Sequence, residues 1–85
     1  MISDKDRNVL KRFGEHLKKL RAEQQLSYRE FAKRSGVNTG DVILYENGES
    51  GPTLLTIKKL SIGLGIHPSE LLSFDFGIDF KGGLE

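Results

Sequence analysis

The sequence predicts an all-α domain of five helices, followed by a short extended strand at the C-terminus. Apolar residues recur at helical spacing along most of the 85-residue chain. Residues that cap helix starts precede these periodic segments, and glycine or proline marks the places where one segment ends and the next begins. We expect residues 1–73 to form one helical domain and residues 74–85 to form a tail.

The first helix is predicted to begin after Ser3 and to run to about Glu23. The hydroxyl of Ser3 can accept a hydrogen bond from the first turn, which makes it a suitable N-cap. The apolar residues that follow share one helical face, so they are expected to enter the core. They are Val9, Leu10, Phe13, Leu17 and Leu20.

The second and third helices are short and are separated by a tight turn. Ser27 and Glu30 form a capping box, which starts a helix that runs to Ser35. Gly36 is expected to end that helix in a left-handed conformation, which any side chain would strain. Asn38 then caps the third helix. The inward side chains of the two helices are expected to be Phe31, Ala32, Val42 and Tyr45.

Two further helices follow. The third helix ends at Gly48, and after a loop Thr53 caps the fourth helix, whose end is marked by Gly65. Pro68 opens a fifth helix that continues through Leu72, because proline suits the first turn of a helix. The fourth helix is expected to direct three apolar side chains inward: Leu54, Ile57 and Leu60.

The tail has a different periodicity. Phe74, Phe76, Ile78 and Phe80 alternate with polar residues or glycine, and a period of two predicts a strand with one apolar face. A single strand is not stable alone. Two arrangements therefore stay open: the tail docks on the core of its own domain, or it pairs with the same strand of a second chain and mediates dimerisation.

The charge is unevenly distributed, although the formal net charge is only +1. Residues 1–34 carry ten lysines and arginines against five acids, whereas the remainder carries three against seven. A basic half favours a polyanion as partner, and a solvated charged helix face is the alternative explanation.

The sequence lacks the residues that several classes of function require. There is no cysteine, and His16 and His67 are isolated, so no metal site is expected. No nucleophile–histidine–acid pattern appears, which predicts a protein that is not an enzyme and needs no cofactor. No apolar run approaches roughly 18 residues and no signal peptide is recognisable, so we expect a cytoplasmic protein without a membrane partner. Leu84 and Glu85 match the kind of scar that a cloning vector leaves.

Ala32, Gly36 and Val42 occur in the order and spacing of two helices joined by a glycine turn, which can place the second helix in a DNA major groove. Over about residues 13 to 72 the sequence resembles the phage repressor/Cro (XRE) family of helix-turn-helix proteins. The segments that carry the resemblance are Leu17-Lys18-Lys19-Leu20-Arg21, Leu26-Ser27-Tyr28-Arg29-Glu30-Phe31-Ala32, Ser35-Gly36-Val37, Tyr45-Glu46-Asn47-Gly48, Pro52-Thr53-Leu54 and Gly65-Ile66-His67-Pro68-Ser69-Glu70-Leu71-Leu72.

The resemblance implies a five-helix, phage-repressor-like domain in a homodimeric transcription regulator that binds specific sequences of double-stranded DNA. It also implies an ion pair between Arg21 and Glu46, which holds the third helix at one angle. The residues implied near phosphates are Ser27, Tyr28 and the backbone of Asn47 and Gly48. The residues implied at base edges are Asn38, Thr39, Gly40, Ile43 and Leu44.

The third helix departs from the family pattern. No lysine or arginine occurs from residue 35 to residue 57, so the usual bidentate readers of guanine are missing. Tyr28 stands where glutamine is frequent in the family, and Glu49 stands where a phosphate-binding lysine is frequent. Two interpretations stay open. Ile43 and Leu44 contact thymine methyl groups in a weak or AT-leaning DNA reader, or they bind a protein partner in an antitoxin-like or mobile-element control protein with weak or lost DNA affinity.

Overall fold

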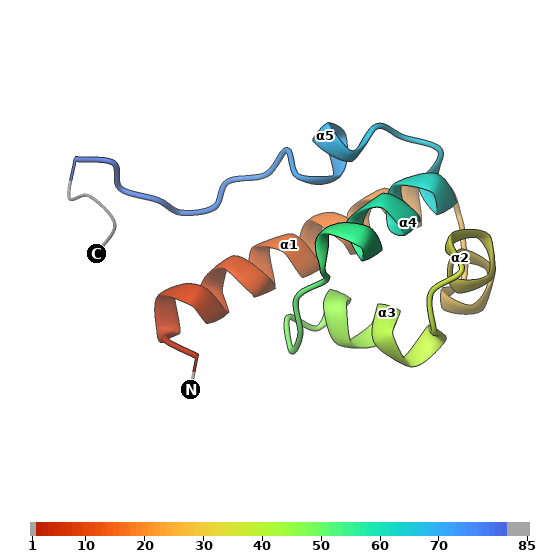
Figure 1. Cartoon of the computed structure of the whole chain (residues 1–85), viewed down its shortest axis with the longest axis horizontal. Coiled ribbons are helices and arrows are strands. Elements are labelled where there is room, and N and C mark those ends of the chain that lie inside the picture. Colours follow the sequence, from red (N-terminus) through yellow and green to blue (C-terminus); the bar gives the residue numbers. More distant parts are fainter. Residues whose placement is uncertain (1, 82–85) are drawn as a thin grey trace.

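The computed structural model describes residues 2–81, and five α-helices lie within that range (Figure 1). They are α1 (Asp4–Glu23), α2 (Tyr28–Ser35), α3 (Thr39–Glu46), α4 (Leu54–Leu64) and α5 (Pro68–Leu71). The prediction of an all-α, five-helix fold is confirmed. The long helix α1 and α4 form the middle of the molecule, with α3 on one side of them and α5 on the other (Figure 1).

The helices begin where the sequence predicts because side chains satisfy the free N–H groups of each first turn. Ser27 and Glu30 make both hydrogen bonds of the expected capping box, each 3.0 Å long. Gly36 and Gly65 end α2 and α4 with φ angles of 72° and 67°, in the left-handed region. The side chains that cap the other four helices are those of Ser3, Asn38, Thr53 and His67.

The core lies where α1, α2, α3 and α4 meet, and α5 adds one side chain to it. Its fully buried apolar side chains are Leu17, Phe31, Val42, Leu60 and Leu71. The prediction that Leu54 also points inward is wrong, because that side chain is 81% exposed. At 100° per residue, Leu54 lies about 70° around α4 from the centre of the buried face, and it stands in the first turn, at the rim of the core.

Two glycines allow helices to meet at their backbones. A Cβ atom on Gly14 would lie 2.5 Å from the carbonyl oxygens of Tyr45 and Glu46, so only glycine lets α1 contact the end of α3 this closely. A Cβ atom on Gly63 would lie 2.8 Å from the Cβ of Ser35, which brings α4 equally close to α2. These contacts fix α2 and α3 relative to the central helices. Within residues 2–81 no helix is long and apolar enough to cross a bilayer.

The predicted C-terminal strand is wrong, since residues 74–81 contain no strand. Short turns interrupt the extended backbone: the side chains of Asp75 and Asp79 accept hydrogen bonds from the N–H groups of Gly77 and Lys81. Gly77 also has a φ of 73°, which a regular strand does not contain. The alternating pattern of apolar residues therefore does not produce strand geometry here. Leu84 and Glu85 lie outside the described residues.

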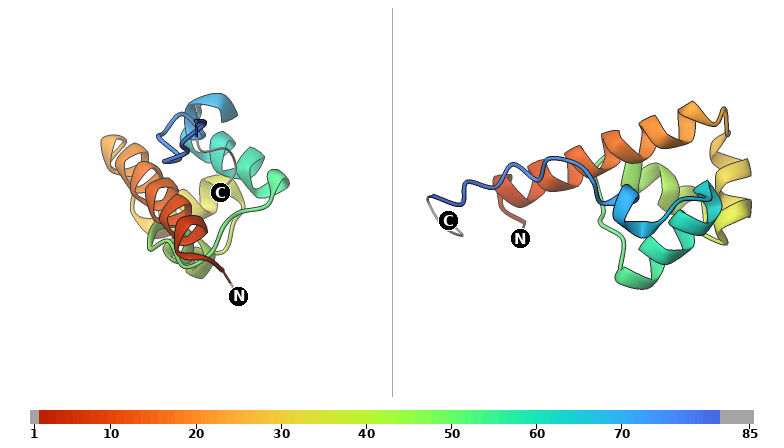
Figure 2. Two further views of the ribbon diagram at one scale, coloured as in Figure 1. Left: turned by 90° about the vertical axis from the view of Figure 1, so that its left-hand side faces the viewer. Right: turned by 90° about the horizontal axis from the view of Figure 1, so that it is seen from above.

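The start of the tail contacts its own domain, and the tail then runs back along α1 toward the N-terminus (Figure 2). The ring of Phe74 lies 5.9 Å from that of Phe13 and stacks on that of Phe76 at 4.3 Å. Arg12 donates to the backbone carbonyl of Asp75 and also pairs with its carboxylate. The docking arrangement therefore holds for the beginning of the tail, while pairing with a second chain stays a prediction.

Candidate nucleic-acid interface

The helix-turn-helix unit is built from α2, a turn at Gly36 and α3. The N–H of Gly36 donates to the carbonyl of Ala32, which closes the last turn of α2. Ala32 and Val42, the small and anchoring residues that the sequence singled out, are both buried between the helices. This packing leaves the opposite face of α3 directed outward.

A buried ion pair connects α3 to α1, as the family resemblance implied. Arg21 donates from Nε and Nη2 to the two carboxylate oxygens of Glu46, at 2.6 and 3.0 Å, and donates from Nη1 to the carbonyl of Leu26 at 2.7 Å. The side chains are 12% and 1% exposed, respectively. The pKa of Arg21 is raised, chiefly by the hydrogen bond to Glu46, while burial opposes the rise. This bidentate contact fixes the end of α3 in both position and rotation.

Tyr28 has a structural role that sequence reasoning did not anticipate. Its ring lies 4.2 Å from the guanidinium carbon of Arg21, in a cation–π contact. The tyrosine ring, at the start of α2, thereby packs against the guanidinium group of the ion pair. The spacing of seven residues between Arg21 and Tyr28, across a helix end, gave no periodic signal that could have revealed this contact.

The outward face of α3 is formed by residues that the sequence placed there. Asn38 and Gly40 are exposed, Thr39 and Ile43 are half-buried, and Leu44 is 40% exposed. The Oδ1 atom of Asn38 accepts a hydrogen bond from the N–H of Gly40, at 3.0 Å. None of these residues belongs to the core cluster, so all five stand at the surface of α3 or at its N-cap.

The groups expected near phosphates differ in availability. The N–H groups of Tyr28 and Arg29, at the start of α2, have no acceptor within the helix. By contrast, the N–H groups of Asn47 and Gly48 already donate to the carbonyls of Ile43 and Tyr45. The side-chain amide of Asn47 lies 3.3 Å from a carboxylate oxygen of Glu49. The start of α2 is therefore better suited to an anion than the end of α3.

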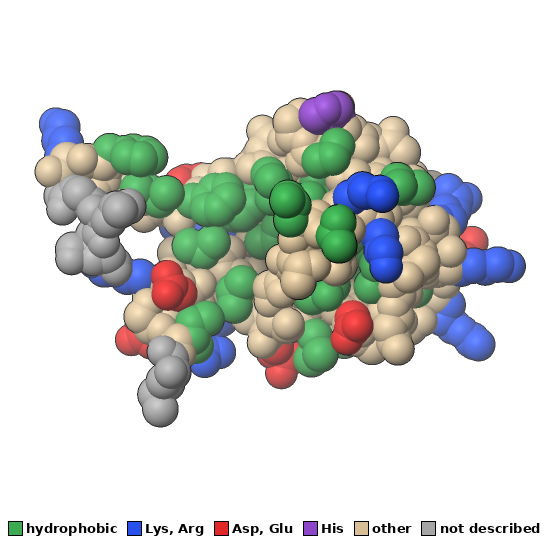
Figure 3. Space-filling view, in the orientation of Figure 1, with side chains coloured by type: hydrophobic (Ala, Val, Ile, Leu, Met, Phe, Trp, Pro, Cys, Tyr) green, Lys and Arg blue, Asp and Glu red, His purple; other side chains and the backbone are tan. Residues whose placement is uncertain are grey.

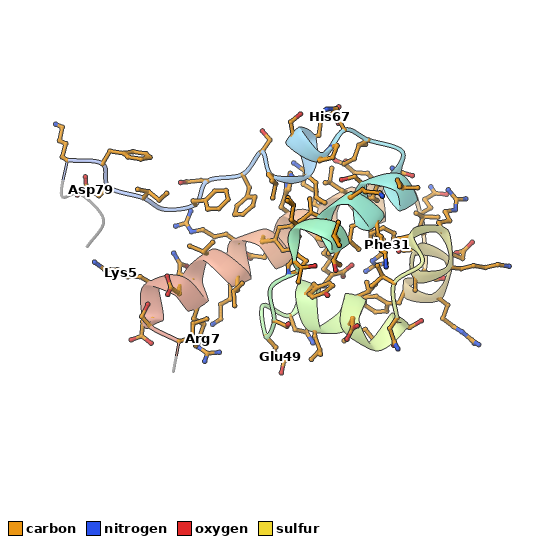
Figure 4. The ribbon with its side chains drawn as sticks, in the orientation of Figure 1. Lys5, Arg7, Phe31, Glu49, His67 and Asp79 are labelled. Atoms are coloured by element: carbon orange, nitrogen blue, oxygen red, sulfur yellow. The ribbon has the colours of Figure 1, made fainter. Side chains whose placement is uncertain are left out.

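Charges of both signs surround α3. Arg29 and Lys33 line a shallow hollow together with Asn38 and Thr39, which concentrates positive charge beside the start of α3. Two acids, Asp41 and Glu49, are exposed on the helix and just beyond it. Figure 4 shows Glu49 projecting from the turn after α3, on the side of the molecule away from α5. The start of α3 thus has Asp41 on the helix close to the two basic residues of α2, and the turn after α3 carries the acid Glu49.

A second exposed surface, on α4, was missed in the sequence. Leu54, Leu55 and Ile62 point outward, although their helix is apolar on most of its circumference. Hydrophobic side chains form a band from the tail to this part of α4 in Figure 3. The spacing of seven residues between Leu55 and Ile62 was the available signal, since it places both on one helical face.

Known proteins are similar to this chain in sequence and in fold. The profile of the helix-turn-helix family HTH_3 matches residues 17–71. Control protein C.MunI of Mycoplasma is 43% identical over 63 residues, which are 73% of this chain and 85% of that protein. The transcriptional repressor RghR of Bacillus subtilis is 42% identical over 66 residues, which are 76% of this chain but only 48% of the repressor.

A solved structure agrees with these matches. The restriction-modification controller protein C.AhdI of Aeromonas hydrophila superposes with a TM-score of 0.71 at 37% sequence identity. The superposition covers 73% of this chain and 94% of C.AhdI. Profile, sequence identity and fold coincide on the segment that contains α2 and α3. The chain therefore belongs to the HTH_3 family of helix-turn-helix proteins, of the XRE type.

Proposed function

We infer that this chain is a DNA-binding transcription regulator of the XRE type, and we propose that α3 enters the major groove. The observation that carries this proposal is the outward face of α3, which the buried pair of Arg21 and Glu46 holds at a fixed angle. An α-helix fits the width of the major groove, and a rigidly held helix presents its side chains in one register.

The proposed contacts divide into two groups. The free N–H groups at the start of α2, near Ser27 and Tyr28, bind a backbone phosphate, and Arg29 and Lys33 add attraction to the duplex. The base edges meet the outward face of α3, and the side chain of Asn47 lies at the C-terminal end of that helix. That outward face comprises Asn38, Thr39, Gly40, Ile43 and Leu44.

We propose sequence-specific binding as a homodimer in the cytoplasm. Two copies would read two half-sites of one operator, as dimeric helix-turn-helix proteins do. The exposed apolar residues of α4 and of the tail support an interface, because a band of hydrophobic side chains marks a surface for protein contact. These residues are Leu54, Leu55, Ile62, Phe76, Ile78 and Phe80. Residues 1–73 would then bind DNA, and residues 74–85 would assist dimerisation.

A restriction-modification controller is the role that the matches favour. C.AhdI, described as such a controller, is covered over 94% of its length, whereas RghR is covered over about half. We therefore propose a controller of this kind, with no catalytic step of its own.

The experiment is enrichment of bound sequences from a random duplex library, followed by fluorescence anisotropy on the enriched duplex at low and high salt. The proposal predicts a common sequence and an affinity that falls as salt rises. Leu44→Glu should weaken or redirect binding without changing the melting temperature, because Leu44 lies outside the core. Ser73→Glu is the matched control, since it adds the same charge beside α5, on the side opposite to α3.

The acids beside α3 and the absence of basic residues from 35 to 57 favour a second candidate, a protein-interaction module with weak or lost DNA affinity. Failure to enrich any sequence at low salt would contradict DNA binding and support this alternative. Specific enrichment would contradict the alternative.

A further inference from the structure

Gly40 is a glycine that the fold itself does not require. Gly36, Gly48, Gly65 and Gly77 have positive φ angles, which favour glycine. Three others would place a Cβ atom within 2.8 Å of a neighbouring atom, and these are Gly14, Gly51 and Gly63. Among the glycines in residues 2–81, Gly40 alone has neither constraint, since a Cβ there would meet just Asn38 Oδ1, at an ordinary 3.4 Å.

A glycine in a helix weakens that helix relative to alanine. Gly40 carries part of this cost as the second residue of α3, on its outward face, where a Cβ atom would contact no group except the side chain of Asn38. A packing requirement within the domain therefore does not explain the residue. A requirement for space on the outside of the helix does explain it.

The neighbours of Gly40 indicate what occupies that space. Ile43 and Leu44 follow by three and four residues, so they lie on the same face one turn later. The N–H of Gly40 is already bonded to Asn38, so this position does not offer a free donor to a phosphate. At this point of the surface the exposed backbone of Gly40 is therefore followed by two apolar side chains. In the major groove the matching group is the C5-methyl of thymine.

Resting on the proposed DNA-binding function, we propose that Gly40 determines sequence specificity, by leaving room for a thymine methyl group that Ile43 and Leu44 contact from the side. The base pair recognised at this position is therefore A·T, with its thymine facing the start of α3. Adding one methyl group to the protein at residue 40 removes the space that the methyl group of the DNA occupies.

The test combines Gly40→Ala with removal of the thymine methyl. The enriched duplex is compared with versions in which each thymine in turn is replaced by deoxyuridine, which lacks only that methyl group. On the thymine duplex, Gly40→Ala should bind about tenfold more weakly than the unaltered protein. At one deoxyuridine position the difference should shrink to about threefold or less, because the new Cβ then has room.

Stability provides the control. Gly40→Ala should melt about 2 to 5 °C higher, since alanine favours the helix and meets no clash. Ala22→Gly, on an exposed position of α1, should melt lower and leave DNA affinity unchanged.

The proposal is overturned if Gly40→Ala binds as tightly as the unaltered protein, or if its loss of affinity is the same at every deoxyuridine position. In both cases the unaltered protein still binds its duplex, so DNA binding itself survives. If the unaltered protein enriches no duplex, that result contradicts both the proposed function and this inference.

Discussion

Removal of the Glu46 carboxylate is expected to destabilise the domain strongly. Glu46 is 1% exposed and accepts two hydrogen bonds from Arg21, which is itself 12% exposed. Glu46→Ala would leave the guanidinium with the Leu26 carbonyl and the Tyr28 ring as its remaining partners. Breaking a buried pair from one side costs about 3 to 5 kcal/mol, because the other charge stays buried without compensation. For a domain of this size, that loss lowers the melting temperature by roughly 12 to 40 °C.

The assay is urea unfolding followed by circular dichroism. Glu49→Ala is the matched control, because it removes an exposed carboxylate three residues later and should change the free energy of unfolding by no more than about 0.5 kcal/mol. The double variant Arg21→Met with Glu46→Leu should recover most of the stability, since no buried charge is left unpaired. A loss below about 1 kcal/mol for Glu46→Ala would refute the reasoning, because exposed pairs behave in that way.

Three further outcomes are expected. The pKa of Glu30 is lowered, first by the hydrogen bond from the Ser27 backbone, so its contribution to stability is complete above about pH 4.5 and is lost as the pH falls through the folded pKa. Glu30→Gln should therefore reduce the pH dependence of the free energy of unfolding in this range, measured by urea titrations at several pH values. An unchanged pH dependence would contradict the capping role. Leu60→Ala should cost about 2 to 5 kcal/mol of stability, whereas Leu54→Ala should stay within about 0.5 kcal/mol because the side chain is exposed. In sedimentation experiments Ile62→Ser should dissociate the proposed homodimer, and an unchanged mass would place the interface elsewhere.

Much of the fold follows from local signals in the sequence. Ser3, Ser27, Asn38 and Thr53 cap helices where expected, because capping depends on a side chain and the backbone two or three residues away. The left-handed turn at Gly36 is likewise a local property of one residue. The pairing of Arg21 with Glu46 is not local, and the resemblance to the XRE family supplied it.

The remaining errors concern tertiary surroundings. Periodicity does not place Leu54 correctly, because α4 is apolar around most of its circumference and no single inward face is defined. The alternating residues of the tail predict a strand, but Asp75 and Asp79 form local turns that compete with extended pairing. The contact of Tyr28 with Arg21 depends on how α1 and α2 meet, so no local pattern indicates it, and the position of Tyr28 beside a phosphate stays a prediction.

The most direct test of the central claim is a titration of the ¹⁵N-labelled protein with its enriched duplex, followed by NMR. If α3 lies in the major groove, the largest changes in amide chemical shift will fall on residues 38–44 and at the start of α2. Changes concentrated on α4 and the tail, with residues 38–44 unaffected, would contradict the proposed binding mode.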